Sequence, residues 1–320
     1  MKDYELLIQN GNTVYSPILE EGIEWETERK GSPGKLTFKI MQDNILKFTE
    51  GNAIRFKYKE NNVFYGFVFT KKRDKNPIIT VTAYDQLRYL KNKDTYVYKN
   101  KTADELTKMI ANDFLLNMGT IEQTGYKIAT RSESNKTLFD IIQTAIDTTT
   151  QNINEMYVLY DDFGKICLKN IERMKIGLVI DEETGENFDY SSSIDNDTYN
   201  QIKLTYDNKD TGKRDVYIAK DTSHINEWGI LQYYDKIDEK VNGRAKVDAL
   251  LKLYNQKTKQ LQIKNAIGDI RVRGGSLIII KMDLGDMKLQ NFMLVEKVKH
   301  TFKNNEHFMD LTLRGNNFIT

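Results

Sequence analysis

The stretch from Tyr84 to Ile110, YDQLRYLKNKDTYVYKNKTADELTKMI, marks the place where a strand pattern ends and a capped helix begins. Before it, residues 53–83 contain short alternating apolar runs (AIRFKY, VFYGFVF and IITVTAY), which favour half-buried strands. Near its end, Thr102-Ala-Asp-Glu105 has the spacing of a capping box. Apolar residues follow at helical spacing, so we expect a helix over about 102–117 and a module boundary near residue 91.

Outward from this boundary, the sequence predicts an α+β fold that is predominantly β. Residues 1–91 have the pattern of an all-β module, in which Trp25 lies on the apolar face of a strand. Gly31-Ser-Pro-Gly34 predicts a hairpin turn and not a phosphate-binding loop, because a strand pattern follows it where a phosphate loop would begin a helix.

Residues 92–192 mix helix and strand patterns, with a second helix starting near Asn135 and a hairpin around Asp161-Asp-Phe-Gly164. Residues 193–320 return to strand patterns around one helix that carries Val247. We therefore expect three modules with boundaries at 91 and 192.

Composition narrows the function classes. Among 320 residues the charges nearly cancel, at a net +1, and no basic stripe is evident, so a sequence-independent nucleic-acid binder is not expected. We expect no specific nucleic-acid binding either. The N-terminus lacks the apolar run of a signal peptide, and the longest apolar runs are far too short to span a bilayer. We expect a protein that is made and folded in a bacterial cytoplasm and does not insert into a membrane.

Candidate catalytic residues are few. Cys167 is the single cysteine; it suits a small buried hydrophobe better than a nucleophile, because no motif supplies a histidine partner. Asp161 and Asp162 could be metal ligands, but two carboxylates on one turn are usually turn formers.

The three histidines, His224, His300 and His307, are far apart in the sequence, except that His300 and His307 face each other across an expected hairpin. His300 and His307 could bind a metal together with Asp310, but no metal-ligand spacing supports this. The alternative is that they are strand-end histidines on a polar face.

One segment, residues 226–239, resembles a sugar-binding arrangement in composition. It places four carboxylates among three aromatic residues. Paired carboxylates beside aromatic rings are typical of glycoside hydrolases, whereas the competing interpretation is an aromatic segment packed under a β module. The carboxylates are Glu227, Asp235, Asp238 and Glu239, and the aromatic residues are Trp228, Tyr233 and Tyr234.

Several strings, in order along nearly the whole chain, resemble the XkdQ/YqbQ-like phage tail protein family, which belongs with late-control D-like proteins and contractile-tail baseplate hubs. They are RKGSPGKLTF (29–38), YDQLRYL (84–90), DTYV (94–97), YVLYDDFG (157–164), DTYNQIKL (197–204), DNKDTGKR (207–214), WGILQYY (228–234) and GDIRVR (268–273).

The resemblance implies two β-barrel-like modules separated by an inserted α/β region: an N-terminal barrel (1–91), the insert (92–192) and a C-terminal barrel with one helix (193–320). It implies a homotrimeric structural hub that joins a sixfold tail tube to a threefold spike in a virion or a phage-tail-like particle. Expected partners are the tube protein or tube initiator and the central spike, and further the tape-measure protein and the baseplate wedge.

We expect no enzyme activity, cofactor, metal or catalytic residue. Because the last strand pattern lies close to Thr320, we expect no appended cell-wall-cutting module. Two alternatives remain open: a tail-associated peptidoglycan hydrolase that uses the acidic residues of 226–239, and a cell-wall-binding module within 92–192.

Overall fold

The computed structural model describes residues 3–20, 22–73, 75–195, 198–208, 212–237, 241–285 and 288–314. The chain forms two compact units. Unit 1 comprises the described residues up to Phe188 together with Gln262–Leu313, and unit 2 comprises those of Asp189–Leu261 together with Arg314. Strands predominate, as the sequence predicts, and residues 193–320 are divided between the two units.

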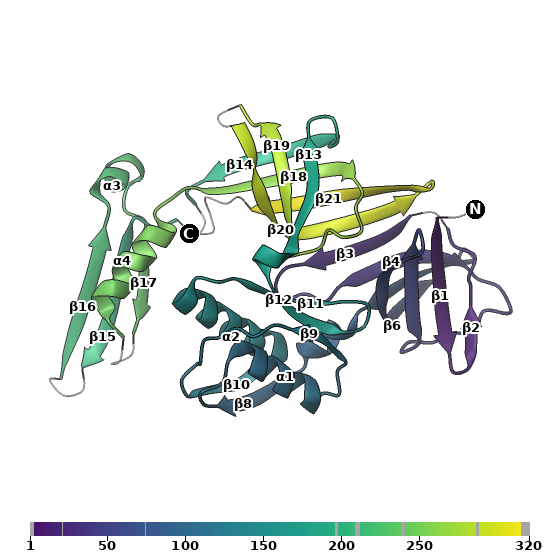
Figure 1. Ribbon diagram of the computed structural model, residues 1–320, viewed down its shortest axis with the longest axis horizontal. Coiled ribbons are helices and arrows are strands. Elements are labelled where there is room, and N and C mark those ends of the chain that lie inside the picture. Colours follow the sequence, from purple (N-terminus) through teal and green to yellow (C-terminus); the bar gives the residue numbers. More distant parts are fainter. Residues whose placement is uncertain are drawn as a thin grey trace. The chain divides into compact units, whose positions relative to one another are not determined.

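One large sheet contains most of the strands (Figure 1). Its pairing order is β14-β18-β21-β20-β3-β4-β7-β6-β5-β1-β2, and β13 and β19 join it through β20. Among the described strands this series is open and closes no barrel, so the expected pair of barrels stays a prediction. The strands are β1 (Tyr4–Asn10), β2 (Thr13–Tyr15), β3 (Ile23–Glu28), β4 (Lys35–Met41), β5 (Ala53–Tyr58), β6 (Asn61–Arg73), β7 (Ile78–Tyr84), β13 (Lys175–Asp181), β14 (Asn187–Ser193), β18 (Thr258–Ile267), β19 (Leu277–Asp283), β20 (Lys288–Lys303) and β21 (Glu306–Arg314).

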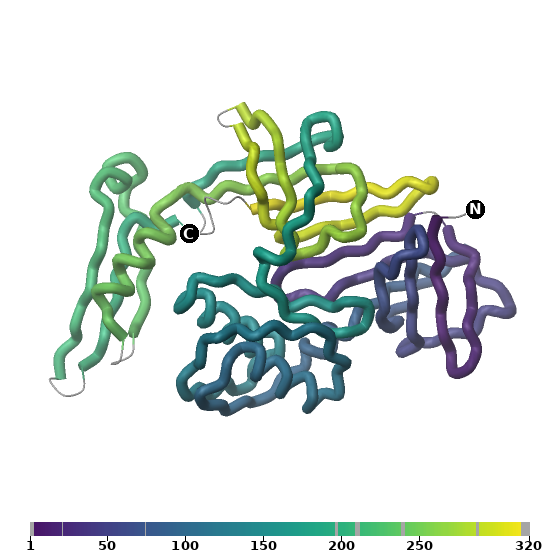
Figure 2. Tube along the Cα trace, in the orientation of Figure 1, coloured from purple at the N-terminus to yellow at the C-terminus, as the bar shows by residue number. Residues whose placement is uncertain are grey.

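The N-terminal and C-terminal strands of unit 1 meet at β3 and β20. They run antiparallel with Trp25 opposite His300, and Figure 2 shows this purple strand beside the yellow one. On its other side β3 pairs with β4 through the turn at 31–34, which confirms the predicted hairpin. Side chains alternate along these strands, so Trp25, Leu36 and Phe38 all point into one hydrophobic core, as their apolar pattern predicts.

The region between β7 and β13 carries two helices packed together with short strands, and we call residues 86–174 the insert. Leu106 and Ile110 of one helix and Ile142 of the other are buried in a single core. The elements are η1 (Gln86–Lys91), β8 (Lys93–Tyr98), α1 (Ala103–Asp113), β9 (Met118–Ile121), β10 (Arg131–Thr137), α2 (Leu138–Ile153), β11 (Tyr157–Asp161), β12 (Ile166–Asn170) and η2 (Ile171–Met174).

Both insert helices are shorter than the sequence pattern indicates. The first ends before Leu115, whose left-handed backbone (φ 53°) cannot continue a helix. The second begins at Leu138 and not near Asn135, because residues 131–137 pair with β8 and the hydroxyl of Thr137 accepts the amide of Asp140 at 3.1 Å.

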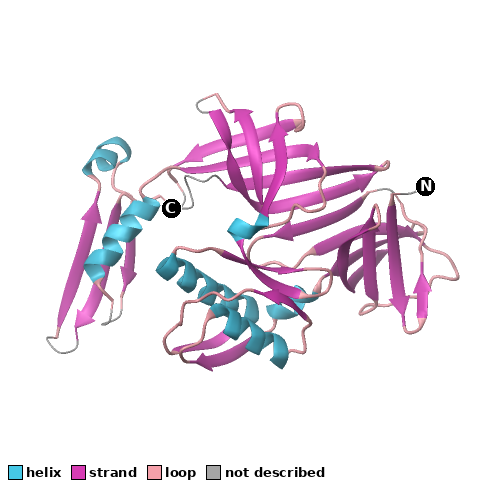
Figure 3. Ribbon diagram, in the orientation of Figure 1, coloured by secondary structure: helices cyan, strands magenta, loops and turns pink. Residues whose placement is uncertain are grey.

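Unit 2 is a two-layer α/β structure. Its sheet order is β16-β15-β17, and α4 covers one face (Figure 3). The elements are β15 (Gln201–Asn208), β16 (Lys213–Lys220), α3 (Thr222–Trp228), β17 (Gln232–Lys236) and α4 (Gly243–Tyr254). The predicted turn between β15 and β16 includes residues 209–211, which lie outside the described residues. None of the described helices is long and apolar enough to cross a membrane.

Candidate functional site at the junction of sheet and insert

Four loops of unit 1 meet where the insert joins the large sheet, and we call this place the junction. The loops are residues 29–34 after β3, 85–87 after β7, 161–164 between β11 and β12, and 269–276 before β19. Each loop comes from a string that suggested the family resemblance: RKGSPGKLTF, YDQLRYL, YVLYDDFG and GDIRVR. Segments distant in the sequence are thus gathered at one place.

Asp85 fixes two of these loops. Its Oδ2 accepts the amide of Gly34 at 2.8 Å, and its Oδ1 accepts the amide of Leu87 at 3.0 Å, which caps η1. A Cβ atom at residue 34 would lie 2.4 Å from Oδ2 of Asp85, so only glycine allows this approach. Burial, and after it the charge of Asp161, raise the pKa of Asp85 well above its ordinary value.

Asp161 brings the β11–β12 turn into the junction. Its Oδ1 accepts the amide of Gly164 at 2.7 Å, and its carbonyl accepts Nη1 of Arg273 at 2.7 Å. Its Oδ2 is buried and has no hydrogen-bond partner in the described part of the chain. Burial raises the pKa of Asp161 to about 7. The guanidinium of Arg273 lies 4.6 Å from the ring centre of Tyr160, so the hairpin is held by polar and cation–π contacts together.

A partly buried ion pair lies on the side of the junction next to β20. The guanidinium of Arg29 binds both carboxylate oxygens of Glu296, at 2.7 and 2.9 Å, and the Arg29 amide donates to the carbonyl of Glu296 at 2.8 Å. Since the Arg29 side chain is only 7% exposed, loss of Glu296 would leave a buried charge without its partner. The amide of Gly274 also donates to the hydroxyl of Thr27 at 2.9 Å.

The space inside the junction is small. Two carboxyl groups with raised pKa values are what a general acid requires, but the enclosed space beside Asp85, Asp161 and Arg273 is about 20 Å³. That volume fits one water molecule and excludes a sugar ring. The hydrogen bonds of Asp85 and Asp161 orient the loops that meet here.

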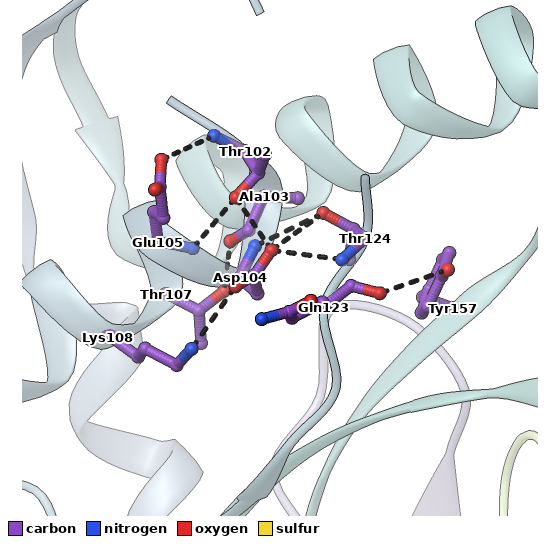
Figure 4. Close-up of polar contacts among 9 residues, drawn as sticks. All are labelled: Thr102, Ala103, Asp104, Glu105, Thr107, Lys108, Gln123, Thr124 and Tyr157. Carbon is purple, nitrogen blue, oxygen red and sulfur yellow. Dashed lines mark hydrogen bonds and ion pairs between the residues drawn. The ribbon is translucent and has the colours of Figure 1, made fainter. Parts of the chain in front are cut away.

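A second polar cluster holds the insert together at the start of α1, as Figure 4 shows. The predicted capping box is present: the hydroxyl of Thr102 accepts the amide of Glu105, and the Glu105 carboxylate accepts the amide of Thr102 at 3.0 Å. The Thr102 hydroxyl also donates to buried Asp104 at 2.7 Å, and Asp104 accepts both the amide and the hydroxyl of Thr124 at 3.0 Å. Burial opposes ionisation of Asp104, but hydrogen bonds from Thr102, Thr124 and Lys108 outweigh it and lower its pKa.

His300 and His307 face each other across the β20–β21 hairpin, as the sequence predicts, but they do not lie on a polar face. His300 is fully buried and stacks on Trp25 at 4.6 Å between ring centres, because the register opposes these two residues. Nε2 of His300 lies 2.9 Å from the carbonyl of Val272 and therefore donates to it, which leaves Nδ1 to accept from Nε2 of His307 at 2.8 Å.

The histidines do not form a metal centre with Asp310. That carboxylate pairs with Lys299 at 3.3 Å and accepts the amide of Asn265. His224 lies in unit 2, where its Nδ1 is 2.7 Å from Oδ1 of Asn255. Within the described residues, no three His, Cys, Asp or Glu side chains gather closely enough to hold a metal ion.

Cys167 is buried in β12, and its burial raises the pKa of the thiol, so it is a poor nucleophile. Asp162 is exposed on the same turn as Asp161. The two aspartates therefore differ: Asp161 points into the junction and Asp162 into solvent.

The residues of 226–239 are distributed over several surfaces of unit 2. Glu227 is exposed in α3, whereas Asp235 lies in β17 with its carboxylate 3.5 Å from the hydroxyl of Tyr233. Tyr233 packs in the core under α4, and Tyr234, the next residue of the strand, points to the opposite face. Trp228 stacks on His224 at 4.0 Å. Asp238 and Glu239 lie outside the described residues.

The described aromatic residues of this segment thus do not line one groove. Sequence reasoning also missed Asp85, Asp104 and Arg273. A signal existed for Asp85, which follows a strand and precedes a short helix, as an N-cap aspartate does. No local signal marks Arg273, because its partners come from distant loops.

Comparison with known proteins decides the family. The YqbQ-like family matches residues 23–314. The chain belongs to the YqbQ-like family. Two relatives from Bacillus subtilis (strain 168) extend over nearly the whole chain. The YqbQ protein is 32% identical over 321 residues, which is 96% of this chain and 95% of that protein. The phage-like element PBSX protein XkdQ is 31% identical over 314 residues, 94% of each chain.

Solved structures of two tail proteins have the same fold as this chain. The 43 kDa tail protein of prophage MuSo2 from Shewanella oneidensis has a TM-score of 0.73 at 11% identity, over 99% of this chain and all of that chain. A tail protein from Neisseria meningitidis MC58 has a TM-score of 0.71 at 10% identity, over 98% and 97%. At such low identity the likeness concerns the fold alone. The matched residues of this YqbQ-like chain include those of both units.

Proposed function

We propose that this YqbQ-like chain is a structural protein of a contractile phage tail or phage-tail-like particle. The observation that carries the proposal is its full-length relationship to the phage-like element PBSX protein XkdQ. The shared fold with a prophage tail protein supports it, because both units of the chain take part in the match.

More specifically, we propose a baseplate hub at the tip of the tail tube, assembled in the bacterial cytoplasm. Three copies would join a sixfold tube to a threefold spike if each chain supplied two similar β modules to one ring. The direct partners would be the tube protein or tube initiator and the central spike, with the tape-measure protein and the baseplate wedge nearby. The junction supports this role, because it fixes the insert rigidly onto the sheet through Asp85, Asp161 and Arg273.

The hydrolase alternative gains no support from the geometry. Glu227 and Asp235 lie on different elements, and the junction carboxylates enclose space for water only. A test is deletion of the gene from the producing strain, followed by complementation. We expect loss of tails, with wild-type and Glu227→Gln chains restoring them equally. If the deletion strain still produced particles with intact tails, the structural role would be contradicted.

A further inference from the structure

The sheet of unit 2 has an uncovered face. On one side, Val247 of α4 packs against Ile202 and Leu204 of β15. Because side chains alternate along a strand, the intervening residues point to the other side. There Val216, Ile218 and Tyr234 are 49%, 43% and 49% exposed. Exposed apolar residues gathered on one face of a sheet mark a surface that a partner covers.

The strand register places positive charges around these apolar residues. Lys203 lies between Ile218 and Tyr234, and Lys220 lies one row further along the sheet. Neither lysine forms an ion pair with a described carboxylate. We call this surface the basic face, and it consists of Lys203, Asp207, Arg214, Val216, Ile218, Lys220, Tyr234 and Lys236.

The charges of the basic face do not cancel one another. Asp207 binds Arg214 at 2.6 Å and Lys236 at 3.2 Å, and it is the single carboxylate against four cations. A net charge of three positive remains. Two copies cannot place this face against itself, because like charges would oppose each other across the contact. The occupant must therefore be acidic and must also offer apolar side chains.

The same chain carries such a surface in unit 1, at the turn between β13 and β14. We call it the acidic turn: Asp181, Glu182, Glu183 and Glu186, beside Asp283, Lys281 and Lys288. Five carboxylates and two lysines leave three net negative charges. None of the four turn carboxylates forms an ion pair with a described lysine or arginine. Val179, 42% exposed, lies two residues before the turn.

Hydrogen bonds hold the acidic turn in one shape. Oδ1 of Asp181 accepts the amides of Glu183 and Thr184 at 3.2 and 3.1 Å, and Oε1 of Glu182 accepts the amide of Asp283 at 3.1 Å. A surface that is already ordered loses little conformational entropy when it binds.

We propose that the basic face of one copy binds the acidic turn of a second copy. The two surfaces are opposite in charge, the basic face carries exposed apolar residues, and exposed Val179 lies next to the acidic turn. A contact between different patches is head-to-tail, and it closes into a ring when the rotation between copies allows. This inference rests on the proposed trimeric hub and names the contact that would hold it.

The test uses the full chain and charge reversal. One variant carries Lys203→Glu and Lys220→Glu, a second carries Glu182→Lys and Glu183→Lys, and a third combines all four changes. Sedimentation velocity at low salt and rising protein concentration gives the mass of each species. We expect the wild type to self-associate, each double variant to bind about tenfold more weakly or worse, and the combined variant to recover, since its charges again match.

The control is Lys246→Glu with Lys252→Glu on α4, outside the basic face, which should leave association unchanged. A wild-type mass that does not depend on concentration would overturn the proposal, as would a combined variant no better than the double variants. The proposal would also be overturned if Lys203→Glu with Lys220→Glu abolished binding of a labelled oligonucleotide and left self-association intact. The location of the chain in purified particles is measured independently of this contact. The proposed contact can therefore fail while the proposed tail location holds.

Discussion

The backbone amide of Gly34 donates a hydrogen bond to the carboxylate of Asp85 across 2.8 Å, joining two loops that are 51 residues apart in the chain. This contact places the start of the insert directly against the β3–β4 turn. It also explains the glycine, because a Cβ atom at residue 34 would lie only 2.4 Å from Oδ2 of this carboxylate.

Gly34→Ala should therefore destabilise unit 1. The added methyl group would lie 2.4 Å from Oδ2 of Asp85, and the buried carboxylate has little room to move. We expect a loss of about 1–3 kcal/mol in the free energy of unfolding, measured by urea denaturation. Gly177→Ala is the matched control, because nothing lies within 4 Å of its Cβ position. Equal stability of the two variants would show that the approach is not tight.

Asp161→Asn should change how stability depends on pH. The pKa of Asp161 is raised from about 3.9 in the unfolded chain to about 7 in the native protein. Between these values the native state binds more protons, so its carboxyl contribution to stability is present below pH 4 and is lost as the pH rises through 7. Asparagine keeps an oxygen for the Gly164 amide and does not titrate.

The variant should thus gain stability relative to the wild type as the pH rises from 4 to 8, measured by thermal unfolding in matched buffers. Asp162→Asn, at the exposed neighbour, should show no such trend. A constant difference between wild type and Asp161→Asn across this range would refute the raised pKa.

His300 and His307 should make stability depend on pH in the opposite direction from Asp161. Burial lowers the pKa of His307 to about 4 and that of His300 well below its ordinary value. Unfolded histidines bind protons below about pH 6.5, so the stability that neutral histidines provide is lost as the pH falls from 6.5 towards 4. His300→Ala should cost about 2–4 kcal/mol, because it empties a buried site and leaves the Val272 carbonyl unpaired.

His224→Ala should cost much less, because this ring is partly exposed in unit 2. Urea titrations at pH 7.5 and 5.0 compare the variants with the wild type. If His300→Ala were as stable as His224→Ala, the buried stacking arrangement would be wrong.

Thr102→Ala should lower the free energy of unfolding by more than the loss of an ordinary helix cap does. Its hydroxyl caps α1 and also donates to Asp104 at 2.7 Å inside a buried cluster (Figure 4). We expect a loss of about 1–2 kcal/mol. Thr137→Ala provides the comparison: it removes the cap of α2 in an exposed setting and should cost about 0.5–1 kcal/mol. The reverse order in chemical denaturation would contradict the assigned role of Asp104.

Local patterns predicted much of this fold. Trp25 is buried as its strand pattern indicates, and the capping box at Thr102 forms as its spacing indicates. Both features depend on neighbouring residues. The pairing of β3 with β20 could not be predicted in this way, because it joins strands more than 260 residues apart. The stacking of His300 on Trp25 follows from that pairing.

The junction shows the same limit. Its loops were recognised one by one as strings, but their convergence is a property of the tertiary fold. The composition of residues 226–239 resembled that of a glycoside hydrolase site, but composition does not show whether side chains face one common groove. The strand β17 directs Tyr233 and Tyr234 to opposite faces.

The central claim is that this chain forms the hub of a tail tip. Electron cryo-microscopy of particles purified from the producing strain, with a tag on the chain, tests it most directly. The claim predicts three copies per particle, arranged around the axis between the tube and the spike. One, two or six copies, or a location along the tube away from the tip, would contradict it.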